Sequence, residues 1–293
     1  MHDVDLGPIG IWTHHLDLQP WAEARVTLQE IEELGYSAVW IPEAVTRDAI
    51  VASTLALEAS TRIIVATGIV PLYARDAMTA NAAWRTIEEA FPGRFILGIG
   101  VSHKPAVEMM RKTTYAPPLA TMRQYLDDMD ASLFLAAQPT TPPRRVLAAL
   151  GPKMLSLSAE RADGAHPYHA TPEHTALARE VIGPDKILAV EQSVVLTTDV
   201  EQARQTARAA LAVYLGLPNY LNNWRRLGFG DDDFENGGSD RLVDAITVWG
   251  DEQAIKRRVQ AHLDAGANHV CIQVLPVAGH PMDEWRRLAP ALL

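Results

Sequence analysis

The sequence has only one cysteine, Cys271, so no disulfide bond can form within the chain. This excludes the disulfide-dense class of small secreted domains and favours a reducing compartment. No apolar run approaches the roughly 18 residues that a membrane-spanning helix requires. Residues 1–5 are polar and acidic and do not read as a signal peptide. We therefore expect a cytoplasmic protein that does not enter a membrane.

Basic residues are also in the minority. The chain has 26 Lys and Arg against 36 Asp and Glu, which gives a net charge of −10. A general nucleic-acid binder needs a basic face, so this class is not expected. An anionic ligand would have to be held by a local basic cluster.

Motifs for metal and serine chemistry are missing as well. The chain has no H-E-x-x-H motif, no cysteine pair and no G-x-S-x-G elbow. His166, His169 and His174 are close in sequence, but His14 and His15 are neighbours on a strand and must point to opposite faces. We expect no catalytic metal.

What the sequence does contain is an alternation of short apolar runs with helix-like segments. Parallel strands buried on both faces have this pattern, and helices between them imply βαβ units. Eight such units in one chain predict an α/β fold, a (β/α)8 TIM barrel, with residues 1–293 as a single domain. The expected strands are residues 8–13, 38–41, 63–70, 95–100, 145–150, 164–168, 187–196 and 269–275.

One segment breaks the alternation. Residues 218–238 contain three consecutive aspartates and an Asn-Gly-Gly run, which favour irregular structure. We predict an insertion between strands seven and eight, either a solvated loop or a lid.

The loops that follow the barrel strands form the active site in this fold. Ser102, His103 and Lys104 follow the fourth strand, and Gly151-Pro152-Lys153 follows the fifth at a helix start. Backbone N–H groups and positive charge at such places bind anions. Gly98-Ile99-Gly100 fails the dinucleotide fingerprint, because His103 stands at the third glycine position. Alternatively, the two glycines are there because the interior of a narrow barrel has room only for small residues.

His14 and Glu43 are the titratable groups best placed at strand ends to exchange a proton with a substrate. Each also has a structural interpretation. His14 would then be a histidine of the core or rim, and Glu43 would pair with Arg47 or Arg75.

Four segments carry a resemblance to a known family: residues 34–43, 66–76, 92–100 and 162–167. Pro92-Gly93-Arg94-Phe95, continuing to Gly100, is the most specific of them. The chain resembles the bacterial luciferase-like monooxygenase superfamily, and within it the oxidoreductases that use the deazaflavin coenzyme F420. The likeness covers nearly the whole chain.

The resemblance implies a bulge in the third strand, with a non-proline cis peptide at Gly68–Ile69 beneath the cofactor ring. It places Glu43 near the ring, although Pro42-Glu43-Ala44 replaces the family's common Ser-Asp-His. Trp12 and His14 would face the substrate side. The cofactor-binding positions that it implies are Glu43, Gly68, Ile69, Val70, Arg75, Gly100, Val101, Ser102, His103, Gly151, Pro152, Lys153, Met154, Gly164, His166 and Pro167.

The implied activity is hydride transfer between the deazaflavin C5 and a small organic substrate, with Glu43 or His14 as proton partner. Lys153 and His103 would hold the charged cofactor tail. The alternatives are an FMN-dependent monooxygenase working with a separate flavin reductase, a barrel that binds a flavin-like ligand without turnover, and a metal hydrolase. The resemblance also implies a homodimer. The residues do not identify the substrate.

Overall fold

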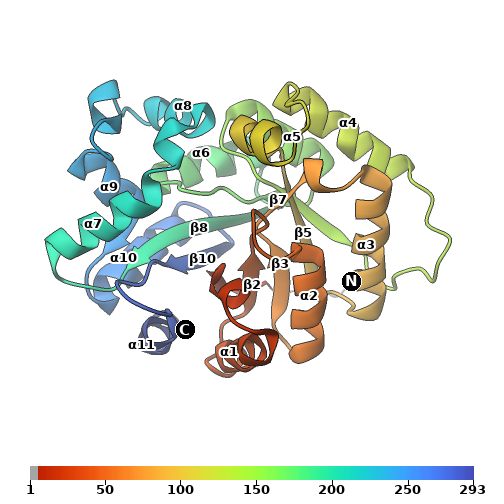
Figure 1. Ribbon diagram of the computed structural model, residues 1–293, viewed down its shortest axis with the longest axis horizontal. Coiled ribbons are helices and arrows are strands. Elements are labelled where there is room, and N and C mark those ends of the chain that lie inside the picture. Colours follow the sequence, from red (N-terminus) through yellow and green to blue (C-terminus); the bar gives the residue numbers. More distant parts are fainter. Residues whose placement is uncertain (1–5) are drawn as a thin grey trace.

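The computed structural model describes residues 6–293 and shows a closed parallel barrel ringed by helices (Figure 1). Its strands pair in the order β10-β1-β2-β3-β5-β6-β7-β8, and β10 closes the ring on β8. The strands are β1 Ile9–Trp12, β2 Ala38–Ile41, β3 Ile64–Thr67, β4 Val70–Pro71, β5 Phe95–Gly100, β6 Arg144–Leu147, β7 Gly164–Ala165, β8 Ile187–Val195, β9 Thr247–Trp249 and β10 His269–Val274. The predicted (β/α)8 barrel is confirmed. The expectation about residues 1–5 lies outside the described residues.

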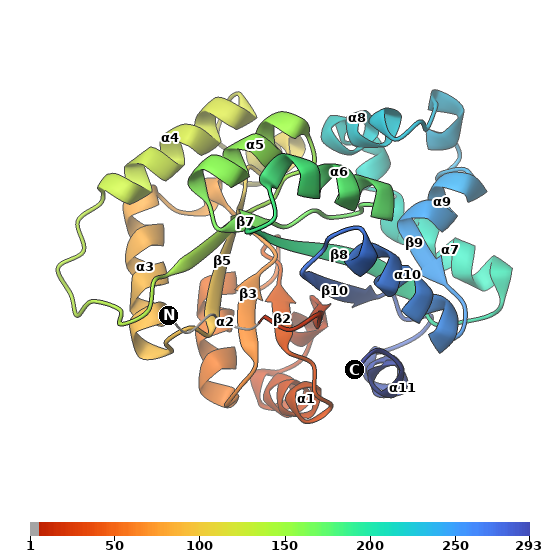
Figure 2. The ribbon, with the colours of Figure 1, turned by 180° about the vertical axis from the view of Figure 1, so that it is seen from behind.

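Helices cover the outside of the barrel in both views (Figures 1 and 2). Asp48, Asp76, Asp199 and Asp251 each cap a helix start by accepting from backbone N–H groups. The helices are α1 Trp21–Glu33, α2 Ala49–Ala59, α3 Ala77–Ala90, α4 Pro118–Ala131, α5 Pro152–Arg161, α6 Pro172–Ile182, α7 Val200–Leu211, α8 Pro218–Arg226, α9 Asp240–Ile246, α10 Glu252–Asp264 and α11 Met282–Leu292. None of the helices within residues 6–293 is long and apolar enough to cross a membrane.

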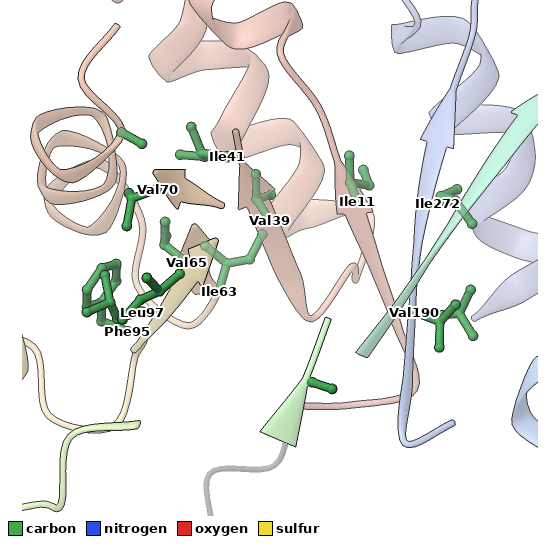
Figure 3. Close-up of a cluster of buried hydrophobic side chains, with 14 of the residues drawn as sticks. Ile11, Val39, Ile41, Ile63, Val65, Val70, Phe95, Leu97, Val190 and Ile272 are labelled. Atoms are coloured by element: carbon green, nitrogen blue, oxygen red, sulfur yellow. The ribbon is translucent and has the colours of Figure 1, made fainter. Parts of the chain in front are cut away.

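Alternate residues of the strands fill two separate cores. Ile11, Val39, Val65, Leu97 and Ile272 pack outward against the helices (Figure 3). The other set fills the barrel interior and includes Trp12, Trp40, Ala66, Ile96, Val146 and Cys271. Because both faces are buried, the strands have the continuous apolar runs seen in the sequence.

Some element boundaries differ from the prediction. The third strand begins at Ile64, one residue later than expected, and it is interrupted at residues 68–69, where the resemblance implied a bulge, before it resumes at Val70 as β4, which pairs with β5. The sixth strand contains only residues 164–165 instead of 164–168, and the chain turns at His169, whose φ is 52°.

The prediction that residues 218–238 are irregular is wrong for much of the segment. It contains α8 and a 3-10 helix at Asp231–Phe234. Tyr220 and Trp224, one helical turn apart, bury one face of α8 against α7 and α9. These three helices form a group at one side of the barrel (Figures 1 and 2). The extra strand β9 follows them; Val194 of β8 pairs with both Val248 and Val274.

Candidate active site

Gly68 lies at the centre of the candidate site, between an indole and an imidazole. The Trp12 Nε1–H donates to the Gly68 carbonyl at 2.9 Å. A Cβ atom on Gly68 would lie 2.7 Å from Trp12 Nε1 and 3.2 Å from His166 Nε2. Only glycine therefore fits at this position. The peptide bond from Gly68 to Ile69 is cis, as the resemblance implied.

His166 supports Gly68 from inside the barrel. Its ring stacks on Trp40 at 4.4 Å, and its Nδ1 lies 2.9 Å from the Ala189 carbonyl oxygen. A carbonyl can only accept, so Nδ1 carries the hydrogen and Nε2 presents a lone pair. Burial lowers the pKa of His166 to about 4. The expected contact of His166 with a cofactor tail is not supported, because the residue is only 2% exposed.

Two more expected cofactor positions are interior packing positions. A Cβ on Gly164 would lie 2.0 Å from the Ile187 carbonyl oxygen, and Gly164 pairs with Ile187 at the first residue of β8. Gly164 is thus at the amino-terminal end of the barrel, away from the loops that form the site. Pro167 is buried and its carbonyl accepts from the Glu191 N–H.

Gly98 and Gly100 make room for the third strand. A Cβ on Gly98 would lie 2.0 Å from the Thr67 carbonyl oxygen, and one on Gly100 would lie 2.5 Å from Ile69 Cδ1. The Thr67 hydroxyl also donates to the Gly98 carbonyl at 2.8 Å. The interpretation as small residues in a narrow barrel is therefore correct, and Gly100 supports Ile69 by packing.

Glu43 is held by two guanidinium groups. Its Oε2 is 2.7 Å from Arg75 Nη2, and its Oε1 is 3.4 Å from Arg111 Nη2. The Glu43 backbone N–H donates to the Ile69 carbonyl, which fixes the carboxylate beside the cis peptide. Of the two expected partners, Arg75 is confirmed and Arg47 is wrong, since Arg47 donates to the carbonyls of Leu16 and Gln19. The carboxylate therefore has a positioning contact on each oxygen.

Arg75 retains a free donor. Its Nη2 donates to both Glu43 and Asp48, whereas its buried Nη1 has no hydrogen-bond partner. An unpartnered buried donor is costly. The group is suited to a polar ligand atom arriving at this side of the site.

His14 lies between Trp12 and a second histidine. Its ring stacks on His15 at 4.5 Å and meets the edge of Trp12 at 6.4 Å. Burial lowers the pKa of His14, and Asp17 opposes that shift. His14 is thus neutral at pH 7 and, being half-buried, remains accessible.

Two loops carry the expected anion-binding residues. His103 and Ser102 are half-buried after β5, and Ser102 has a φ of 57°. Burial lowers the pKa of His103, while a side-chain hydrogen bond to Asn219 raises it. The exposed Lys104 faces Glu108 at 4.0 Å instead.

The second loop opens α5. Gly151 is the N-cap, Pro152 and Lys153 are exposed, and Met154 is half-buried. Pro152 has no N–H, and the Met154 and Leu155 N–H groups donate to the Gly151 carbonyl, so the first turn of α5 leaves the Lys153 N–H for a ligand. Val70, in β4, is buried and pairs with Ile99, and Val101 is half-buried directly after β5.

Comparison with known proteins decides the family. The family model described as luciferase-like monooxygenase matches residues 6–269. The chain belongs to the luciferase-like monooxygenase family. It is an oxidoreductase of that family, with the cis peptide at Gly68–Ile69 described above.

Relatives of this luciferase-like chain include a protein named for coenzyme F420 and a methanopterin reductase. A protein of Mycobacterium tuberculosis named as a coenzyme F420-dependent oxidoreductase is 23% identical, over 90% of this chain and 94% of its own. The 5,10-methylenetetrahydromethanopterin reductase of Archaeoglobus fulgidus is 26% identical, over 88% and 82%.

Solved structures of both cofactor types share the fold. An F420-dependent secondary alcohol dehydrogenase, in complex with an F420–acetone adduct, has a TM-score of 0.77 at 14% identity, over 98% of this chain and 99% of that chain. The oxygenating constituent of 3,6-diketocamphane monooxygenase from Pseudomonas putida, in complex with FMN, has a TM-score of 0.67 at 15% identity, over 98% of each chain.

Sequence reasoning missed an aromatic cluster beside Trp12 in this luciferase-like barrel. The Tyr168 ring lies 5.2 Å from Trp12, and its hydroxyl donates to Gln273 at 2.8 Å. Tyr214 and Tyr220 pack around it at 5.5 and 6.4 Å. The residues come from separate loops and α8, so no local pattern connects them.

Buried polar groups lie behind that cluster. Glu191 accepts from the His169 backbone N–H and the Ser193 hydroxyl, and burial raises its pKa to about 7. His166, His169 and His174 do not converge, since His166 and His174 bond to different carbonyls. Within residues 6–293, no cluster of three or more His, Cys, Asp or Glu is suited to a metal ion.

Proposed function

We propose that this protein is an F420-dependent oxidoreductase that transfers a hydride between the deazaflavin C5 and a small organic substrate, acting as a single domain. The observation that carries the proposal is the side-chain-free Gly68, fixed between Trp12 and His166 at the barrel mouth. Trp12 and His166 fill the space beside the Gly68 Cα, so the cofactor ring would lie against the outer side of this group, between the two loops with anion-binding features. A relative named as F420-dependent, matched over 90% of the chain, supports the choice of cofactor, as does the shared fold with an F420 complex.

The residues present suit that group. Bound deazaflavin would supply the hydride. Arg75 offers its unpartnered Nη1 and the α5 start offers the backbone N–H of Lys153. His103 and Lys153 would bind the charged tail, His103 from the β5 loop and Lys153 from the first turn of α5.

His14 is the proton partner in this proposal. It is neutral at pH 7, half-buried, and adjacent to Trp12, so it can take a proton from a substrate hydroxyl or return one. Glu43 and Arg75 orient the site, because both Glu43 oxygens are already engaged by arginines. Trp12, Tyr168 and Tyr214 would enclose the substrate and exclude water.

The second candidate is an FMN-dependent monooxygenase that receives reduced flavin from a separate reductase. The shared fold with an FMN complex favours it, since the loops that suit an F420 tail also suit the FMN phosphate. Fluorescence titrations of the purified protein with F420 and with FMN separate the two. Micromolar or tighter F420 binding with negligible FMN binding supports the deazaflavin, and the reverse preference overturns it.

A homodimer in the cytoplasm completes the proposal. The outer face of α2 exposes Val51 at 59% and Leu55 at 38%. A barrel helix that is apolar on both faces fits a subunit contact. Sedimentation of the wild-type chain and of Val51→Glu tests this, with a monomeric wild type as the contrary result.

A further inference from the structure

Gln273 lies inside the mouth of the barrel, one strand away from Trp12. Its backbone pairs with Ser193 of β8, and β1, which ends at Trp12, pairs with the other edge of β10. Cys271 belongs to the interior core, and residues two apart on a strand share a face, so Gln273 also points inward. Its Oε1 accepts from the Tyr168 hydroxyl at 2.8 Å, and the Tyr168 ring lies 5.2 Å from Trp12. The amide group therefore belongs to the Trp12 side of the site.

One end of the Gln273 amide is engaged and the other is not. The Tyr214 hydroxyl donates to the Tyr168 hydroxyl at 3.3 Å, and Tyr168 in turn donates to the Gln273 oxygen. Among residues 6–293, the Gln273 Nε2 has no hydrogen-bond partner, and it is not fully enclosed. Gln273 is only 6% exposed, and amide donors at such depth are normally satisfied. The amide thus presents an unused donor that a ligand in the mouth can reach.

The residue that orients this amide, Tyr168, is fixed by the backbone turn after it. His169 has a φ of 52°, a conformation that residues with side chains seldom adopt. The Glu191 carboxyl group accepts from the His169 N–H at 2.9 Å, and the Trp224 indole donates to the His169 carbonyl at 3.2 Å. Side chains from β8 and α8 therefore hold both backbone polar groups of His169. A donor whose support is fixed in advance costs less to order when a ligand binds.

We propose that Gln273 donates a hydrogen bond to an oxygen atom of the substrate, and that Tyr168 is the positioning residue for this donor. The inference rests on the proposed function and deepens it by naming a substrate class, a small neutral molecule with a carbonyl or hydroxyl oxygen and an apolar body. The apolar body lies against the Trp12 and Tyr168 rings. His14, which also contacts the Trp12 ring, exchanges the proton of the same oxygen.

The balance of the reaction is consistent with these two roles. An alcohol that is oxidised gives up a hydride from carbon to the bound cofactor and a proton from oxygen to His14. The carbonyl oxygen that results still accepts from the Gln273 Nε2, because the amide neither gains nor loses a proton. Gln273 thus binds the substrate in both oxidation states.

The test follows ligand binding by nuclear magnetic resonance, so it does not depend on turnover. Protein labelled with ¹⁵N in its side chains, with and without F420, is titrated with cyclohexanone. The control ligand is cyclohexylammonium, which has the same ring and hydrogen-bond donors but no acceptor. The variants Gln273→Met and Trp12→Phe assign the Gln273 amide and Trp12 indole resonances. We expect cyclohexanone to shift both resonances with one Kd, and cyclohexylammonium to leave the Gln273 amide unchanged.

Variants separate the donor from its support. Gln273→Met removes the amide, and Gln273→Glu keeps an acceptor for Tyr168 but loses the N–H groups. Each should raise the Kd of cyclohexanone, followed at Trp12, about fivefold or more, the effect of one hydrogen bond. Tyr168→Phe keeps the ring and removes the anchor, so it should have a smaller effect, about twofold. Gln253→Glu makes the same change at an exposed residue of α10 and should leave the Kd as it is.

The contrary results are distinct. An unchanged Kd in both Gln273 variants, with or without a loss of stability, would show that this residue does not bind the oxygen. A Trp12 resonance that cyclohexanone does not shift would show that no ketone binds beside this indole; either result overturns the inference. Fluorescence titration of the same samples with F420 tests the cofactor separately. If cyclohexanone binds through Gln273 and F420 does not bind, the donor stands and the proposed cofactor is wrong.

Discussion

His14 is a half-buried imidazole whose protonation state can be read from the dependence of turnover on pH. Burial lowers its pKa below 6.5, so the neutral form that accepts a proton is lost only as the pH falls below that value. We predict that His14→Asn lowers kcat by about a hundredfold or more, the usual contribution of a general acid or base. Steady-state rates from pH 5 to 8, with matched cofactor occupancy, should show an acidic limb in the wild type alone. An unchanged kcat would remove His14 from the mechanism.

Glu43 is expected to position the site and not to exchange a proton, so its substitution should affect stability and not the pH profile. Its side chain is 8% exposed and binds Arg75 and Arg111. Glu43→Gln should lower the free energy of unfolding by about 1.5–3 kcal/mol, because charge-assisted hydrogen bonds to arginine are lost. The acidic limb of the pH profile should stay where it is. Urea unfolding measures the first effect.

Asp48→Asn is the control for Glu43→Gln. Asp48 binds the same Arg75 Nη2, but its side chain is 51% exposed, and asparagine still caps α2. We expect a loss of less than about 1 kcal/mol. If Glu43→Gln abolishes turnover and leaves stability unchanged, Glu43 is the proton partner.

Single residues were predictable from the sequence where their position on a strand determined their surroundings. Glu43 follows β2, and its predicted pairing with Arg75 is confirmed. Gly164 and His166 were assigned to ligand contacts because they belong to a family segment. Burial depth is not encoded locally, and both residues pack inside the barrel.

At the scale of elements, β5 packs closely against the third strand because Gly98 and Gly100 of β5 have no side chains. Gly100→Ala would place a methyl group 2.5 Å from Ile69 Cδ1 and 2.8 Å from Ile69 Cγ1. We predict a loss of about 1–3 kcal/mol in unfolding free energy from overpacking. Because Ile69→Ala removes both atoms, Gly100→Ala should cost much less in that background, with a coupling of about 1 kcal/mol or more.

Gly98→Ala is the control, because no second substitution can relieve the clash that it creates. Its methyl group would lie 2.0 Å from the Thr67 backbone oxygen, which no side-chain substitution removes. Urea unfolding of the single and double variants measures the coupling. Strictly additive effects of Gly100→Ala and Ile69→Ala would contradict the packing interpretation.

Elements with strong periodicity were predictable, and those that depend on tertiary contacts were not. The limits of β2 and β5 match the apolar runs, because runs buried on both faces have clear ends. Helix α8 was missed since its asparagines and arginines make it polar, with Tyr220 and Trp224 alone marking the buried face. The break between β3 and β4 lies inside a continuous apolar run, so composition could not show it.

At the scale of the whole molecule, closure of the barrel follows from the alternation of strands and helices, but the contents of its interior do not. The interior holds histidines and a carboxylate among aromatic rings, drawn from strands across the chain. His166 and His269 both contact Trp40, at 4.4 and 5.9 Å between ring centroids. Such groups make stability depend on pH.

Buried histidines should make the protein unstable in acid. Burial lowers the pKa of His166 and His269 to about 4, and that of His169 and His262 to about 3. As the pH falls below 6.5, the unfolded chain binds protons that the folded chain cannot, so the free energy of unfolding decreases. Each histidine contributes on the order of 3 kcal/mol by pH 4, so together they are comparable to a typical folding stability.

Glu191 acts with the opposite sign. Its pKa of about 7 means that the folded chain keeps a proton that the unfolded chain releases above about 4.5, so this group alone destabilises the fold as the pH rises from 4.5 to 7. Four histidines outweigh one carboxyl group, and we predict that the urea midpoint falls steadily from pH 7 to pH 5. Glu191→Gln should steepen that dependence, because it removes the opposing contribution. A midpoint independent of pH in this range would mean that the histidines titrate normally, and that the interior is hydrated.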